Sequence, residues 1–254
     1  MRILVRRLVG RSCAVAWAYA IVAGAAHAAE PASVIAPTLK VGDSWTLQET
    51  NERGPSGFSR TRQETSIVRL NADSMVVAMK TEGAPTAPQQ RIMGLDWGLK
   101  LAASDGEQKT TAQPLSFPLK VGESWTADWV DSRRQGNQIS AHFRKTYKVV
   151  GWEDVTVPAG TFHALKIEAH GSGDADMIIP SVAQSTAVAG GGSGTAISHV
   201  QAGGSGKVHV TTFAIIYYAP EVKHPVKTVD EQYNGSEVMT RRDTEELVSY
   251  KLME

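Results

Sequence analysis

The sequence predicts a mainly β protein, built as an antiparallel curved sheet that forms either a half-barrel or a sandwich. Three observations support this fold class. Residues Gln138 to Val150 alternate apolar and polar side chains, the period-two pattern of a half-buried antiparallel strand. Asn234-Gly235 joins two strand-like segments and is a strong hairpin signal. Helical periodicity is nearly absent, so we expect a meander of strands.

A seven-residue segment recurs at a spacing of 80 residues. The segment from Leu39 to Trp45 (LKVGDSW) returns from Leu119 to Trp125 (LKVGESW). A repeat at a fixed offset indicates architecture before any local propensity does. We therefore expect an internal duplication with halves 39–118 and 119–254, each opened by a glycine turn that leads into a strand.

The tryptophans of these segments have two interpretations. Trp125, Ala127 and Trp129 share one face of a strand, and Trp45 and Leu47 take the matching places in the first copy. A buried Trp contributes at most about 4–6 kcal/mol from its apolar area. The favoured interpretation is that they anchor a core. The functional interpretation makes Trp45, Trp125 and Trp129, together with Phe143 of the next strand, candidate ligand-binding residues.

In the first half, turn clusters rich in Gly, Pro, Asn and Asp separate the strand segments. A Pro-rich loop spans residues 83–88, and Trp97 is placed in or near a turn. The expected strands are Ser44–Glu49, Phe58–Leu70, Met75–Thr81 and a short one within Arg91–Leu101.

In the second half, we expect a turn at residues 152–154 and a tight turn at Pro158-Ala159-Gly160. Residues 171–206 are predicted to be a Gly-rich flexible insertion, either a flap over a cavity or a disordered segment, with short strands possible at 177–180 and 197–200. The expected strands are Gln138–Val150, Val155–Val157, Thr161–Glu168, Lys207–Tyr218, Val226–Tyr233 and Glu237–Leu252.

Residues 1–28 have the features of a cleaved secretory signal peptide. A basic region containing Arg2, Arg6, Arg7 and Arg11 precedes a short apolar run, and Ala26-His27-Ala28 is an A-x-A cleavage site. The mature chain is then a single β-rich domain, residues 29–254, soluble in the periplasm and with no later transmembrane segment. The one cysteine, Cys13, lies in the leader, so no disulfide is expected.

Charge excludes some partners. The whole chain carries 26 basic and 26 acidic residues, so removal of the four leader arginines leaves an excess of four acids. This balance argues against nucleic acid or an anionic membrane surface as a partner.

Motif searches predict no catalytic residue, no metal site and no cofactor. The chain has no H-E-x-x-H, no C-x-x-C and no complete G-x-S-x-G. Asp174-Ala175-Asp176 lacks the glycine and distal glutamate of a calcium loop. His163 could form an acid–base pair with Glu168 or Glu221 if the fold brings them together.

Three signatures, taken in order, carry a family resemblance. They are the repeated LKVG[DE]SW segment, VTVPAGTF at Val155–Phe162, and YYAPEV at Tyr217–Val222, which leads to the final Leu247–Leu252. They resemble a group of exported bacterial β-proteins of unknown function and, more distantly, the half-open barrels of periplasmic lipoprotein carriers. The resemblance covers most of residues 39–252 outside the Gly-rich stretch. It implies a fold and no catalytic residues, and Lys223-His224 replaces the usual glycine after Pro-Glu-Val.

Three functions remain open at this point. The leading hypothesis is a non-enzymatic periplasmic module that binds an apolar or lipid-like ligand or an envelope component. The second is a structural or interaction role, with strand Glu237–Leu252 as an exposed sheet edge for a partner protein. The third is a hydrolase with a site around His163.

Overall fold

The structure is a computed structural model that describes residues 30–54, 57–102, 108–132, 138–179, 182–187, 196–201 and 204–254. The predicted leader lies outside these residues. Residues 31–254 form one compact unit. No helix in the described part of the chain is long and apolar enough to cross a bilayer. The described strands are β1 (Ser44–Glu52), β2 (Phe58–Leu70), β3 (Ser74–Thr81), β4 (Gln89–Gly94), β5 (Leu99–Ala102), β6 (Gln108–Thr111), β7 (Ser124–Asp131), β8 (Gln138–Val157), β9 (Gly160–Ile179), β10 (Val182–Ala187), β11 (Ala196–Gln201), β12 (Gly204–Ala219), β13 (His224–Asn234) and β14 (Met239–Lys251).

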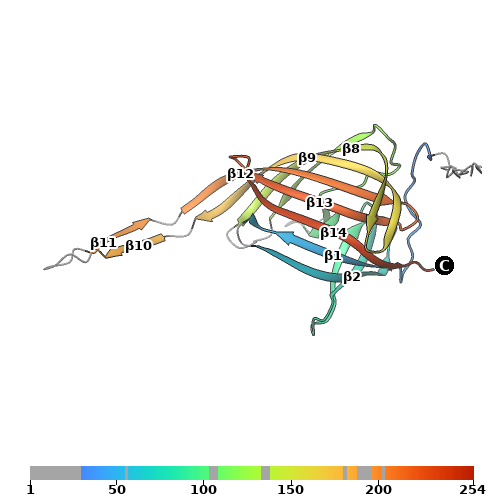
Figure 1. Cartoon of the computed structure of the whole chain (residues 1–254), viewed down its shortest axis with the longest axis horizontal. Helices are drawn as coiled ribbons and strands as arrows, with labels where there is room; N and C mark the ends of the chain where they lie inside the picture. The colour runs from blue at the N-terminus through green and yellow to red at the C-terminus, as the bar shows by residue number, and fades with distance from the viewer. Residues whose placement is uncertain are drawn as a thin grey trace, which may run out of the picture. The chain divides into compact units, whose positions relative to one another are not determined.

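Twelve of the described strands form one antiparallel sheet in the order β6-β5-β4-β3-β2-β1-β14-β13-β12-β9-β8-β7 (Figure 1). Strand β1 pairs with β14, so the first and last strands of the chain lie side by side in the middle of the sheet. The two outermost strands, β6 and β7, contact each other, and the sheet therefore curls into a nearly closed barrel. The predicted antiparallel curved sheet is confirmed. Strands β10 and β11 form a separate hairpin.

Both copies of the repeated segment form the same turn. Gly42 and Gly122 have positive φ values of 95° and 86°, a conformation that glycine adopts without a steric penalty. The Gly42 amide donates to the Ile67 carbonyl at 2.8 Å, and the Gly122 amide donates to the Val149 carbonyl at 2.9 Å. Beyond the turn the surroundings differ, because β1 pairs with both β14 and β2, whereas β7 lies at one end of the described sheet.

Two predicted boundaries are wrong. The segment within Arg91–Leu101 forms two strands, β4 and β5, with Trp97 at φ 63° in the turn between them. Strand β8 continues through residues 152–154, where a turn was expected, and ends at Val157. A β-bulge between Val149 and Gly151 interrupts the regular pairing of β8 with β9 just before the predicted turn. The strand therefore bends at this point without ending.

The structure also places part of the predicted Gly-rich insertion in regular strands. Residues 171–179 continue β9 and residues 204–206 begin β12, while β10 and β11 pair with each other. Gly171 and Gly173 leave room for neighbouring side chains, because a Cβ at Gly171 would clash with Lys145 and one at Gly173 would clash with Phe143. The other residues of the 171–206 insertion lie outside the described residues.

The C-terminal hairpin is covered on both sides. Strand β14 pairs with β1 and with β13, so the predicted strand Glu237–Leu252 is not a sheet edge. The hairpin predicted from Asn234-Gly235 is present with a four-residue connection, in which the Asn234 side chain accepts hydrogen bonds from the amides of Ser236 and Val238.

Candidate ligand-binding cavity

The interior of the barrel changes from apolar to polar along the strands. At the start of β1 the space is filled by side chains that are almost fully buried, including Trp45, Ile67, Leu165, Tyr218 and Leu247. Further along β1, the same inward face carries polar or charged residues. The polar inward positions on β1, β8, β13 and β14 include Glu49, Asn51, Lys145, Asp230, Asp243 and Glu245.

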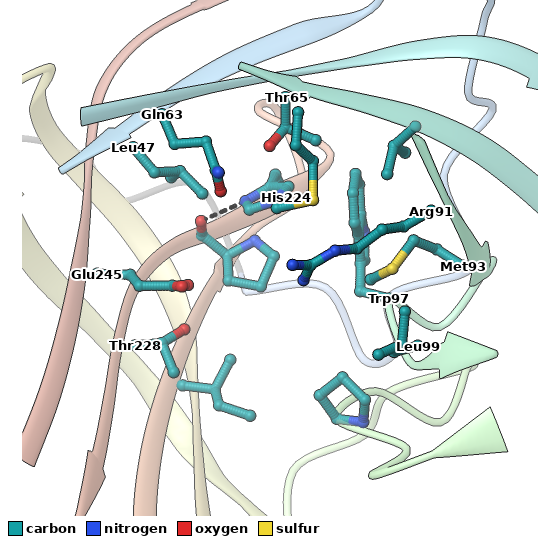
Figure 2. A pocket seen from close by; sticks show the side chains of 15 residues that line it. Leu47, Gln63, Thr65, Arg91, Met93, Trp97, Leu99, His224, Thr228 and Glu245 are labelled. Atoms are coloured by element: carbon teal, nitrogen blue, oxygen red, sulfur yellow. Dashed lines mark hydrogen bonds between the residues drawn. The ribbon is translucent and has the colours of Figure 1, made fainter. Parts of the chain in front are cut away.

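A cavity of about 300 Å³ lies between the apolar core and this polar region (Figure 2). Its lining comes from strands at both ends of the chain, because β1 to β5 form one wall and β12 to β14 form the other. Nine of its 15 lining residues are apolar: Leu47, Val77, Met79, Met93, Trp97, Leu99, Pro114, Ile216 and Pro225. The six polar ones are Gln63, Thr65, Arg91, His224, Thr228 and Glu245.

An aromatic cluster forms the boundary between the cavity and the core. The Trp97 ring meets the His224 ring edge to face with centroids 4.3 Å apart, and the Trp45 ring stacks on His224 at 5.2 Å. The Trp45 indole donates to the Val222 carbonyl at 2.8 Å. Burial lowers the pKa of His224 to about 4, so its neutral ring donates from Nδ1 to the Pro225 carbonyl. Above about pH 5 this side of the cavity therefore carries no charge.

Glu245 is a titratable carboxyl on the β14 wall. Its side chain is exposed to solvent in the cavity, although many protein atoms of the curled sheet crowd around it. This enclosure raises the pKa of Glu245 to about 7, and the negative charges of Glu49, Asp243 and Asp230 act in the same direction. Near neutral pH the wall is therefore a mixture of carboxylic acid and carboxylate.

Arg91 supplies the positive charge of the opposite wall. It lies on β4, where it pairs with Val77 of β3 and shares the inward face with Met93. Figure 2 shows its guanidinium extended into the cavity, on the side opposite Glu245. No carboxylate of the described residues forms an ion pair with it. By contrast, Arg62 lies 3.9 Å from Glu82, and Arg242 lies 2.7 Å from Glu231.

Beyond the cavity, a salt bridge crosses the barrel. The Lys145 ammonium of β8 lies 2.6 Å from the Asp230 carboxylate of β13, and these two strands are not neighbours in the sheet. The Lys145 side chain is only 9 % exposed, and Asp230 supplies its counter-charge. Gly171 lets the lysine side chain pass across β9. The contact joins β8 to β13 across the interior of the barrel.

The four candidate residues from the sequence are not among the residues that line this cavity. Trp45 lies beneath it and packs against Trp97 and His224. Trp125 is half-buried on β7, stacks on Tyr147 and donates to the Gln113 carbonyl at 2.9 Å. Trp129 and Phe143 stack on each other at 5.4 Å between β7 and β8.

Sequence reasoning missed Arg91 and Glu245, although strand parity could have indicated both. Glu245 is two residues before Leu247, which is fully buried, and Arg91 is two residues before Met93, which packs against the core. In a strand, residues two apart share a face. A charged residue at an inward position is therefore the signal, and the distance between the two segments in sequence conceals that they share one cavity.

His142, His163 and His209 each pair with an aspartate of a neighbouring strand on the outer face. His163 Nδ1 is 2.6 Å from Asp154 Oδ1 across β8 and β9, an acid that the sequence analysis did not consider as its partner. Its ring stacks on Trp152 with centroids 5.2 Å apart. The side chains of His163 and Asp154 are both substantially exposed to solvent. This arrangement is a surface pair and does not enclose a substrate.

A second set of histidines forms a row on the outer face of β7, β8, β9 and β12. His142 Nε2 lies 2.6 Å from Asp128 Oδ1, and His209 Nδ1 lies 2.9 Å from Asp174 Oδ1. The hydrogen bond from His209 lowers the pKa of Asp174. Within the described ranges no group of three such side chains could hold a metal ion. The row stabilises strand pairing through cross-strand side-chain contacts.

Comparison with known proteins gives two structures of low similarity. One is a proposed lipoprotein from Parabacteroides distasonis, with 12% identity and a TM-score of 0.44. The other is a proposed exported protein with a YmcC-like fold from Bacteroides fragilis, with 14% identity and a TM-score of 0.37. Each match covers 86% of this chain and 99% of the other. No family model and no curated protein matches the sequence.

Proposed function

We propose that this is an exported protein of the cell envelope that binds one small, mainly apolar molecule in its interior cavity. The observation that carries the proposal is the cavity itself, which is about 300 Å³ in volume and lies next to a filled core. Ligand sites typically occupy about 300–1,000 Å³ and combine apolar walls with a few polar groups. Export is inferred from the leader sequence, with its four arginines and its A-x-A site.

The chemistry of the lining supports binding over catalysis. Apolar side chains from β3, β4 and β5 form a continuous surface of Val77, Met79, Met93 and Leu99. Methionine side chains adapt to ligands of different shape, because each side chain is unbranched and has three rotatable bonds. Burial lowers the pKa of His224 to about 4, so its ring is a weak base near neutral pH.

The first test is to identify what the protein carries. Protein prepared gently from the periplasm is weighed by native and by denaturing mass spectrometry, and any bound compound is extracted. We expect a native mass above that of the mature chain, with a small apolar compound in the extract.

The second test uses the neutral fluorescent probe N-phenyl-1-naphthylamine and a matched pair of variants on β2. Gln63 lines the cavity, whereas Glu64 points outward and is exposed. Gln63→Trp fills the cavity and should weaken probe binding by at least about tenfold, the loss expected from displacing a few buried contacts. Glu64→Trp should bind like the wild type. Equal binding by both variants would show that the probe binds elsewhere, and the proposal would be wrong.

A further inference from the structure

We infer that the ligand of this cavity is an amphipathic monocarboxylate, whose carboxylate pairs with Arg91 while its aliphatic body lies on the apolar wall. This inference rests on the proposed function and adds the chemical class of the ligand. It follows from the position of Arg91, from the nature of the side chains around it and from the acids on the facing wall.

The first step concerns the guanidinium. Arg91 is exposed to solvent, its guanidinium extends into a mainly apolar cavity, and it has no carboxylate partner among the described residues (Figure 2). A guanidinium offers paired N–H donors in a planar fork that matches a carboxylate, and it remains charged at every physiological pH. An apolar cavity that contains such a group favours a ligand with an anionic end.

The second step concerns the body of the ligand. Met79 and Met93 are on the two strands that hold Arg91 and its partner Val77, and Trp97 and Leu99 follow directly along the chain. The head and the apolar part of a ligand can therefore contact one wall together. A volume of about 300 Å³ corresponds to about ten water-sized groups, which suits a chain of roughly eight carbons.

The third step concerns the number of charges. Glu245 lines the facing wall and Glu49 lies opposite it on β1, while the neighbouring Asp243 is ion-paired with Arg241. These acids would repel a second negative charge on the ligand. The wall therefore selects against phosphate monoesters and dicarboxylates and in favour of a single carboxylate.

The experiment compares octanoate with 1-octanol, a neutral molecule of nearly the same size, by isothermal titration calorimetry at pH 7. We expect the wild type to bind octanoate more tightly than octanol. Arg91→Met should weaken octanoate binding about tenfold or more, as expected for the loss of a charge-assisted contact, and should change octanol binding less than about twofold.

Two further variants serve as controls. Arg62→Met removes the same charge from the outer face of β2, where Arg62 is exposed and pairs with Glu82. It should leave octanoate affinity unchanged, which separates contact in the cavity from general electrostatic attraction. Arg91→Lys keeps the charge but loses the planar fork, and it should bind octanoate with an affinity between those of the wild type and Arg91→Met.

The outcomes separate the two proposals. If wild type binds octanol as well as octanoate, or if Arg91→Met weakens both equally, the carboxylate inference is overturned and the apolar binding function stands. If wild type binds neither compound and N-phenyl-1-naphthylamine also fails to bind, the proposed function is overturned as well.

Discussion

Glu245 occupies a position where strand alternation would place a core side chain. It faces the cavity, and enclosure by the sheet makes the protonated carboxyl the favoured form over an unusually wide pH range. Arg91 is its counterpart on β4, and the two charges lie on opposite walls with no ion pair joining them among the described contacts. Polar residues in such places cost stability and are typical of binding sites.

The raised pKa of Glu245 predicts a pH-dependent stability. In the folded protein its carboxyl holds a proton up to about pH 7, whereas the unfolded chain releases it near pH 4.5. The stabilisation is therefore present at low pH and is lost as the pH rises through 7. Glu245→Gln should become progressively more stable relative to wild type between pH 5 and pH 8, measured by urea unfolding.

The control for that experiment is Glu64→Gln, because Glu64 is an exposed residue on the outer face of β2. Its stability difference from wild type should not change over the same pH range. A difference for Glu245→Gln that is also constant with pH would contradict the assigned titration.

At the scale of elements, β8 and β9 show how glycine serves packing inside a strand. The sequence predicts a loop from Gly171 onward, because glycine is common in loops and rare in strands. In the structure Gly171 and Gly173 continue β9, since the side chains of Lys145 and Phe143 occupy the space that a Cβ would need. The strand pairing on both sides of β9 outweighs the weak propensity of glycine.

This packing predicts a contrast between two glycine substitutions. Gly171→Ala should lower the free energy of unfolding by about 1–3 kcal/mol, because the new Cβ clashes with the Arg144 carbonyl and the Lys145 side chain. Gly151→Ala, with nothing within 4 Å of the new Cβ, should change it by less than about 1 kcal/mol. Urea unfolding would measure the free energy of unfolding of both variants, provided that the dependence on urea concentration (the m-value) is the same as in the wild type. Equal costs would show that backbone freedom, and not the clash, decides the effect.

At the scale of the whole molecule, the barrel is held closed at several different points. The pairing of β1 with β14 joins the two ends of the chain, and the Lys145–Asp230 salt bridge joins β8 to β13 across the interior. The salt bridge adjoins the polar residues next to the cavity. It therefore ties the β13 wall of the cavity to β8 on another side of the barrel.

The salt bridge predicts an asymmetry between its two partners. Asp230→Asn leaves the buried ammonium of Lys145 without its counter-charge and should cost about 1–3 kcal/mol or more. Lys145→Met replaces the ammonium by an apolar chain of similar length and should cost less than about 1 kcal/mol. The double variant Lys145→Met/Asp230→Asn should resemble Lys145→Met. A double variant that is as unstable as Asp230→Asn alone would contradict this assignment.

Local chemistry determined much of the fold. The alternation of residues 138–150 specified a strand with one buried face, and Lys145, the exception in that pattern, does lie inside. The two glycine turns at Gly42 and Gly122 also follow from their sequences, because a positive φ is a property of a single residue. These features depend on neighbours along the chain, which a sequence displays directly.

The cavity depends on contacts that the sequence does not display. Arg91 and Glu245 are 154 residues apart, and they come to face each other because β1 pairs with β14 and the sheet then curls until β6 meets β7. The register of that pairing decides which side chains surround an empty volume and which fill the core, so Trp45 is buried beneath the cavity while Trp97 lines it. The sequence thus determined the strands and turns, and closure of the sheet decided where a ligand could lie.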